Sequence, residues 1–419
     1  MLTDGLFSDP DLAAIMGAPT QIAAMGRVEA ALARTQGRLG MIPADVAARI
    51  AAVAEDFAPD PATLIASAAT AGIPAQAYVA ALKKACGEDS AFAHYGATSQ
   101  DIQDTALILQ LRDALAVIED RLTALDRELA ARADAHGAQP IPARTRFQIA
   151  APTTLGAKIA VWRAPLLRHL ARLSELRPRL LTVSLHGAAG TGAAFGAEAA
   201  ALRAGVAREL GLGSPDVPWH AARDTVAELA GWLSLVTGSL GKIGVDLILL
   251  GQSEIGEVTA GTGGGSSTMP QKSNPVAAEA LVSIARLNAG GVGMVHGAMI
   301  HAQERDGSAL GVEWQTLPDM VVRTGASLRL ALDLAFSLAP DTGRIARTFD
   351  ADRGAMLAEA AGFHLSRHMP RPEALRIVAE ALRQIANSDA DTLATALSRL
   401  QPGHDWAAIL APERNTGKS

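Results

Sequence analysis

The chain of 419 residues has a single cysteine, Cys86, and only 4% aromatic residues. One cysteine excludes an internal disulfide and a cysteine-cluster metal site, and we expect Cys86 to be a small helical side chain rather than a nucleophile. Because 49% of the residues are nevertheless hydrophobic, the core must be built mainly from aliphatic side chains. Many alanines and long leucine patterns favour packed helices over a sheet.

Several targeting and partner signals are also missing. A net charge of −6 with no basic block argues against a nucleic-acid partner. The N-terminus lacks the basic start and apolar core of a signal peptide, and with one cysteine this predicts a cytoplasmic protein. The most apolar long stretch, Leu229 to Leu250, carries Lys242 and Asp246. We therefore expect a helix buried among protein partners and no membrane span.

No nucleotide fingerprint, P-loop or HExxH motif occurs in the sequence. The histidines His94, His296 and His301 do not form a metal-ligand pattern. We therefore predict no metal ligands and no cofactor.

Helical periodicity dominates the middle of the chain. Apolar residues in alternating steps of four and three predict a first long helix; they are Leu111, Leu115, Ile118, Leu122, Leu125 and Leu129. A second helix is predicted from about Ile159 to Leu173, bent near Pro165. Three more are predicted at about 224–252, 275–303 and 314–338. These patterns predict an all-α fold with a central bundle of five long helices, and no strand-like alternation of useful length appears.

Breaks in the pattern predict three domains. Residues 1–100 form an N-terminal helical domain, 101–344 the central bundle with an active-site loop, and 345–419 a small C-terminal helical domain. A long bundle rich in alanine and leucine exposes more apolar surface than one chain covers. We therefore expect a homo-oligomer.

The most informative segment is Gly265-Ser-Ser-Thr-Met-Pro-Gln-Lys-Ser-Asn-Pro275, which follows a glycine-rich run. It combines a flexible backbone, a serine suited to acid–base chemistry, a lysine cation and an amide donor. These groups suit an anionic substrate covered by a mobile loop. A plain glycine linker would have no need of them.

This segment resembles the signature of the fumarase/aspartase superfamily, Gly-Ser-Ser-x-Met-Pro-x-Lys-x-Asn-Pro, at every fixed position. The resemblance implies that Ser266 carries the acid–base chemistry next to a carboxylate. It implies that Lys272 is the second catalytic residue and, with Asn274, holds that carboxylate. Ser267 and Met269 are expected to line the same site. It also implies a homotetramer with a central helical bundle and active sites shared among subunits.

A second polar segment, His94-Tyr-Gly-Ala-Thr-Ser-Gln-Asp101, precedes the first long helix. Thr98 and Asp101 have the spacing of a capping box, so they could serve only to start the helix. A helix N-terminus with two hydroxyls is also an anion site, and the segment matches the family's first active-site block. We predict that Thr98 and Ser99 bind substrate, and that capping is a compatible second role.

A third segment, Arg144-Thr-Arg-Phe-Gln148, resembles the family's Gly-Arg-Thr-His-x-Gln block, which makes Arg144, Thr145 and Gln148 candidate substrate-binding residues. Arg146 stands where many of these lyases carry a catalytic histidine. Arginine stays protonated, so it cannot transfer that proton. It can bind a substrate carboxylate with two hydrogen bonds, although an ordinary surface arginine would look the same in sequence.

Among the branches of the superfamily, the chain resembles the 3-carboxy-cis,cis-muconate cycloisomerases most. The resemblance is carried by 6–33, 94–104, 176–181 with the following glycine bend, and 313–318. It implies lactonisation of a small polycarboxylate in the protocatechuate branch of the β-ketoadipate pathway. Two alternatives stay open: an adenylosuccinate lyase-like C–N lyase that releases fumarate, and an inactive structural member of the family. Gln271 and Ser273, where adenylosuccinate lyases usually carry histidine and arginine, disfavour the first.

Overall fold

The structure is a computed structural model that describes residues 2–265, 268–389 and 391–417. It contains two compact units. Unit 1 comprises Met1–Thr123, Leu166–Gly241 and Ala280–Arg329; unit 2 comprises Ala124–Pro165, Lys242–Glu279 and Leu330–Ser419. The three predicted domains, bounded at residues 100 and 344, stay a prediction.

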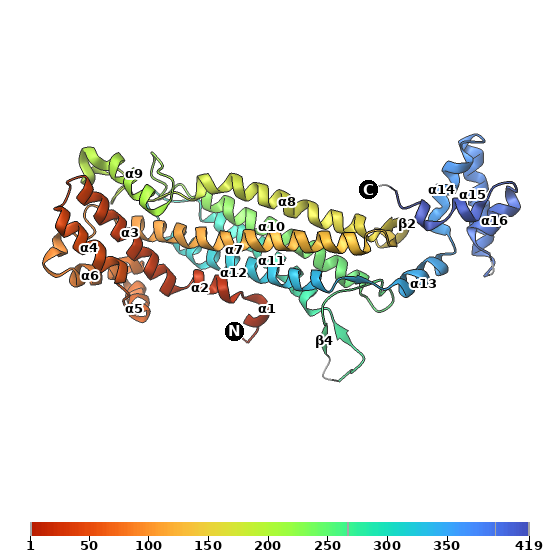
Figure 1. Cartoon of the computed structure of the whole chain (residues 1–419), viewed down its shortest axis with the longest axis horizontal. Coiled ribbons are helices and arrows are strands. Elements are labelled where there is room, and N and C mark those ends of the chain that lie inside the picture. The colour runs from red at the N-terminus through yellow and green to blue at the C-terminus, as the bar shows by residue number, and fades with distance from the viewer. Residues whose placement is uncertain (1, 266–267, 390, 418–419) are drawn as a thin grey trace. The chain divides into compact units, whose positions relative to one another are not determined.

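Helices make up most of the chain, and five long ones run through its middle (Figure 1). They are α7 (Ser99–His136), α8 (Leu155–Leu180), α10 (Asp224–Leu250), α11 (Val276–Gly297) and α12 (Gly307–Phe336). All six apolar residues of the predicted stripe on α7 are buried, none more than 2% exposed, because this stripe is the packing face of the helix. The all-α prediction with five long helices is confirmed.

The second long helix, α8, extends beyond its predicted range of about Ile159 to Leu173 at both ends. Two further helix ends differ in the connection between α11 and α12. α11 ends at Gly297, several residues before the predicted end. α12 begins at Gly307 rather than near Trp314, because the Asp306 carboxylate accepts the N–H of Ser308 at 2.9 Å and caps the helix start.

The N-terminal part of unit 1 has a core of aliphatic side chains around the buried Tyr78. Here α3 (Ala18–Arg38) packs against α4 (Ala44–Asp56) and α9 (Ala199–Leu210). Gly26 permits the close approach, since a Cβ there would lie 2.3 Å from the carbonyl oxygen of Ala54. The remaining elements of this part are α1 (Asp4–Phe7), α2 (Pro10–Ile15), α5 (Pro61–Ala71), α6 (Pro74–Ala85), η1 (Gly87–Ala91) and η2 (Ala193–Glu198).

The C-terminal part of unit 2 has its own core around Trp406, which is 1% exposed. A capping box at Thr392 starts one of its helices, α16. The elements of this part are α13 (Thr342–Asp352), η3 (Ala355–Leu357), α14 (Ala358–Leu365), α15 (Arg371–Ala386), α16 (Leu393–Leu400), α17 (Trp406–Ile409) and η4 (Pro412–Arg414).

Short strands in unit 2 are a finding that the sequence did not predict. β1 (Pro140–Thr145) pairs antiparallel with β2 (Gln148–Thr154). β3 (Val258–Thr259) pairs with β6 (Ala339–Pro340), and β4 (Gly264–Gly265) with β5 (Ser273–Asn274). Most residues of β1 and β2 are half-buried or exposed, so the strands show no alternation of apolar and polar residues that could have revealed them.

Among the described residues, α10 is the one helix long and apolar enough to cross a membrane, and half of its apolar window is buried inside the structure. Its charged residues Lys242 and Asp246 pair with each other. Asp246 also accepts the indole N–H of Trp162 on α8 at 2.7 Å. The two charges that interrupt the apolar run thus neutralise each other within α10, and Asp246 also connects α10 to α8.

Candidate active site

The signature segment forms a β-hairpin in unit 2, labelled by β4 in Figure 1. Gly264 faces Asn274, and Gly265 faces Ser273. The predicted residues Ser266 and Ser267 lie outside the described residues. Of the other predicted residues in this hairpin, Met269 and Lys272 are exposed and Asn274 is half-buried. The backbone N–H of Lys272 donates to the carbonyl of Met269 at 3.0 Å, which closes a turn in the connection.

The glycines before the signature serve close packing as well as flexibility. Gly263 has a φ of +68°, and a Cβ there would lie 1.8 Å from Oγ of Ser273. A Cβ on Gly264 would lie 2.5 Å from a methyl group of Val276. Only glycine fits at these positions, so this part of the run is required for the hairpin to close.

The third segment forms the turn between β1 and β2. Thr145 pairs with Gln148, so Arg146 and Phe147 alone make the connection. Both have positive φ, 50° and 67°, as in a type I′ turn, where glycine and asparagine are preferred. Phe147 is 80% exposed, and Arg146 is exposed as well. Two bulky residues held in a strained conformation at an exposed tip are typical of a functional site.

Arg144 lies at the root of this hairpin and is already paired. Its guanidinium donates two hydrogen bonds, of 2.7 and 2.6 Å, to the carboxylate of the buried Glu257. Arg144 and Gln148 also line a cavity of about 670 Å³ with Arg344 and Arg347 of α13. Glu254 and Asp352 line the same cavity, so its charges are mixed, and Arg344 and Arg347 are the cations there that Glu257 does not engage.

Lys158 on α8 adds a further cation in unit 2. Burial, more than the neighbouring charges, lowers the pKa of its ammonium group. Asp246 and Glu257 act in the opposite direction and favour the charged form.

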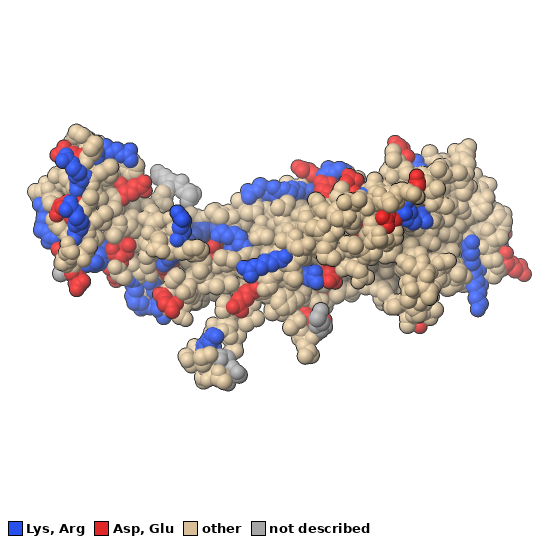
Figure 2. All heavy atoms as spheres, turned by 180° about the vertical axis from the view of Figure 1, so that it is seen from behind, with Lys and Arg blue, Asp and Glu red and all other residues tan. Residues whose placement is uncertain are grey.

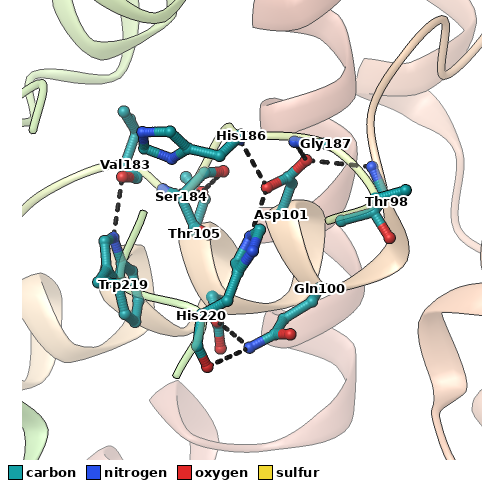
Figure 3. Close-up of polar contacts among 12 residues, drawn as sticks. Thr98, Gln100, Asp101, Thr105, Val183, Ser184, His186, Gly187, Trp219 and His220 are labelled. Carbon is teal, nitrogen blue, oxygen red and sulfur yellow. Dashed lines mark hydrogen bonds and ion pairs between the residues drawn. The ribbon is translucent and has the colours of Figure 1, made fainter. Parts of the chain in front are cut away.

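The second segment lies in unit 1, at the start of α7 (Figure 3). Ser99 is the first helical residue, and Thr98 precedes it; both are half-buried. Asp101 accepts the backbone N–H of Thr98 at 3.1 Å, as in one half of the predicted capping box. The two hydroxyls thus stand at the N-terminus of α7, the positive end of the helix dipole.

Asp101 does more than cap the helix. This fully buried carboxylate also accepts the backbone N–H groups of His186 and Gly187, at 3.0 and 2.9 Å, and binds Nε2 of His220 at 2.7 Å (Figure 3). It therefore fixes the glycine-rich bend after His186 against the helix start. Burial, followed by the positive charge of Arg203, lowers the pKa of His186 to about 4.

Arg305, in the connection before α12, is a residue that sequence reasoning missed. Its guanidinium donates to Thr98 Oγ1 at 3.3 Å, to Gln100 Oε1 at 2.7 Å and to the carbonyl of Ala188 at 3.1 Å. An exposed cation thus stands beside the predicted anion site. In the sequence, the charged run Glu304-Arg-Asp306 between two predicted helices was the feature that could have indicated Arg305.

A buried ion-pair network supports the same end of α7. Arg223 is 1% exposed and binds Asp104, at 2.8 and 3.2 Å, and Glu313. Removal of one partner would leave an uncompensated buried charge. The network therefore holds α7, the start of α10 and α12 in one arrangement.

The predicted site residues thus form three groups. Thr98 and Ser99 stand with Arg305 in unit 1. In unit 2, Arg144, Thr145, Arg146 and Gln148 share the β1–β2 hairpin, and Met269, Lys272 and Asn274 share the signature hairpin.

The chain is similar to known enzymes over nearly its whole length. The sequence profile of the lyase family matches residues 11–290. The 3-carboxy-cis,cis-muconate cycloisomerase of Pseudomonas aeruginosa is 42% identical over 91% of this chain and 85% of its own length. The N-acetyl-S-(2-succino)cysteine lyase of Dickeya dadantii is 34% identical over 91% of this chain and 84% of its own. The crystal structure of the 3-carboxy-cis,cis-muconate lactonizing enzyme of Pseudomonas putida superimposes with a TM-score of 0.93 at 37% identity, and the match covers 99% of this chain and 96% of that one.

A long helical bundle with polar segments at a helix start, a strand hairpin and a glycine-rich hairpin defines a class of lyase-type enzymes. The chain belongs to this lyase family, the fumarase/aspartase superfamily. Within it the chain is similar to the cycloisomerase branch, as the sequence predicted.

Proposed function

We propose that the chain converts 3-carboxy-cis,cis-muconate into a carboxymuconolactone, in the protocatechuate branch of the β-ketoadipate pathway. The observation that carries this proposal is the 42% identity, over 91% of the chain, to a cycloisomerase of that name. The intact signature and the arginine at the tip of the β1–β2 hairpin support it.

The reaction suits a site with arginine in place of histidine. A carboxylate of the substrate adds to the conjugated double bond; it is already ionised, so no base is needed. A C–O bond forms, and the π electrons move into an enolate-like carbanion. Lys272 and Asn274 offset its negative charge. Ser266 donates a proton to the carbon as general acid and regains one from water.

Three carboxylates on one substrate need several cationic contacts. Thr98, Ser99 and the N-terminus of α7 would bind one carboxylate together with Arg305. In unit 2, the Arg146 guanidinium and the Gln148 amide at the exposed end of the β1–β2 hairpin are likewise suited to a carboxylate. Arg144 would orient that hairpin through Glu257 rather than bind substrate alone.

Elimination from a succinyl compound is the second candidate, because the N-acetyl-S-(2-succino)cysteine lyase of Dickeya dadantii is 34% identical. Elimination from such a compound needs a proton donor for the leaving group. Arg146 cannot act as that donor, because arginine keeps its proton. A substrate carboxylate leaves or attacks without protonation, and this difference favours lactonisation.

We further propose that the active form is a homotetramer in which several subunits complete each site. On the face seen in Figure 2, charged side chains form small groups with wide areas between them. Large apolar residues of the long helices are exposed on single chains, among them Leu167, Leu235, Leu287 and Met294. A second copy of the chain would cover them, and light scattering of the purified protein measures the oligomer directly.

The test is the ultraviolet absorbance of purified protein mixed with 3-carboxy-cis,cis-muconate in the presence of EDTA. Loss of the conjugated diene band with formation of a lactone is the expected result. A folded tetramer that leaves the diene unchanged would overturn the proposal. In that case N-acetyl-S-(2-succino)cysteine and adenylosuccinate are the next substrates to assay.

A further inference from the structure

Three histidines gather in the C-terminal part of unit 2. His364 lies in the last turn of α14, and His368 follows four residues later. His404 comes from the segment just before α17. One ring nitrogen of each lies within 4.8 Å of the others, and Nε2 of His364 is 3.1 Å from Nδ1 of His404.

We propose that these three histidines bind a divalent transition-metal ion, with Zn²⁺ as the best fit. Imidazole suits zinc, and Zn–N bonds of about 2.0–2.1 Å place two tetrahedral ligands about 3.3 Å apart. The 3.1 Å separation of His364 and His404 is close to that value. His368 is exposed, so its ring is free to complete the set by a small rotation.

A stack of aromatic rings is the alternative role for the cluster. The His364 and His404 rings do lie edge-to-face, 4.9 Å apart, and both are near Trp406. The 3.1 Å contact also fits a hydrogen bond in which one of these two rings donates and the other accepts. Neither stacking nor that bond accounts for the ring nitrogen of His368, which lies within 4.8 Å of both. Protonation of two such rings would bring like charges together, and none of the three pairs with a carboxylate among the described residues. A dication shared by neutral imidazoles satisfies all three lone pairs.

A cavity lies beside the cluster. Imidazole binds a metal ion through the lone pair of a neutral ring nitrogen. His364 also lines a cavity of about 470 Å³ with Glu359 and Arg367, which provides an entry route and space for water as a fourth ligand.

Binding would join two segments that are far apart in the sequence. The ion would hold the end of α14 to the segment before α17, beside the buried Trp406. The cavity at His364 is also lined by Ala151 and Pro152 of β2, the strand that carries Gln148. The proposed ion thus stabilises the support of the β1–β2 hairpin and takes no part in the lactonisation.

The experiment uses the tag-free, full-length protein after EDTA treatment and dialysis. We expect calorimetric titration to show one Zn²⁺ per chain, and Zn²⁺ to raise the melting temperature by several degrees. Co²⁺ should give the visible absorption of a tetrahedral nitrogen site. His368→Gln, on an exposed side chain that should not affect folding, should weaken binding at least tenfold and abolish the cobalt spectrum.

The matched control is His296→Gln, an exposed lone histidine on α11, which should bind Zn²⁺ as the wild type does. His404→Gln, checked for folding by circular dichroism, provides a second variant of the set. Equal zinc affinity in the wild type and His368→Gln, or no zinc binding by the wild type, would overturn the proposal. Neither readout depends on enzymatic activity, so the outcome is separate from that of the proposed function.

Discussion

The start of α7 and the signature hairpin both carry predicted substrate-binding residues, yet they are built in opposite ways. At the start of α7, the carboxylates of Asp101 and Asp104 are at most 1% exposed, and both are fully engaged by N–H donors and an arginine. The signature hairpin has two-residue strands, a glycine-rich approach and mostly exposed side chains.

The two regions differ in how much they contribute to the stability of the fold. A buried ion network is costly to break and allows one arrangement. An exposed hairpin with few packed neighbours contributes little to global stability and opens easily. If both regions bind substrate as proposed, the helix start would be the rigid part of the site and the signature hairpin the less stable one. Four substitution or pH experiments test these two regions and two other parts of the chain.

Ser266→Ala should have the largest effect on activity. If the serine is the general acid, turnover should fall by about 10²- to 10⁴-fold, while the melting temperature and the oligomer stay unchanged. Ser273→Ala removes a hydroxyl from the same hairpin and should keep most of the turnover. Steady-state kinetics and calorimetry measure both, and full activity in Ser266→Ala would refute the assignment of the serine.

Asp104→Asn should have the largest effect on stability. It removes one of the two carboxylates that neutralise the buried Arg223, so the free energy of unfolding should drop by about 3–5 kcal/mol. Asp113→Asn, on the same helix but exposed, should change it by less than about 1 kcal/mol. Urea unfolding measures both, and similar losses in the two variants would contradict the division.

Stability should fall as the pH is lowered from about 6.5 to about 4. Burial lowers the pKa of His169 to about 4, with Arg172 and Arg168 acting in the same direction, and His186 reaches a similar value. Over this range the unfolded chain binds protons that the folded chain does not, which costs up to about 3 kcal/mol per histidine. Urea unfolding at a series of pH values measures the slope. His169→Gln should reduce the slope, and an unchanged slope would count against the buried neutral ring.

Phe147→Gly should have the smallest effect on stability. Relief of the positive φ is partly cancelled by the extra freedom of glycine in the unfolded chain, so the free energy of unfolding should rise by less than about 1 kcal/mol. Ile149→Gly, at an extended position of the same hairpin, should lower it. If Phe147→Gly destabilises as much as Ile149→Gly, the turn is not strained.

The long helices were predictable because their apolar stripes repeat over many turns and must be buried. The stripe from Leu111 to Leu129 needed no knowledge of its partners. The β1–β2 hairpin was not predictable, since its residues lack a buried face and the turn uses Arg146 and Phe147 where glycine would be the signal. Clusters of side chains from distant parts of the sequence were the least predictable feature.

The candidate site residues were likewise predictable only where a local sequence pattern marks them. Thr98, Ser99, Lys272 and Asn274 stand in contiguous motifs and could be proposed from sequence. Arg305 reaches Thr98 across a separation of more than two hundred residues, and His404 meets His368 only after α15 and α16 have returned the chain. Contacts of that kind depend on tertiary packing and leave no local pattern.

The ion pair between Arg144 and Glu257 couples two hairpins that are far apart in the sequence. Arg144 stands two residues before the tip of one hairpin, and Glu257 precedes the glycine run that leads into the other. One pair of side chains thus joins the bases of the two hairpins. A substitution at the tip of either hairpin leaves this shared base in place, whereas loss of Arg144 or Glu257 would disturb both hairpins at once.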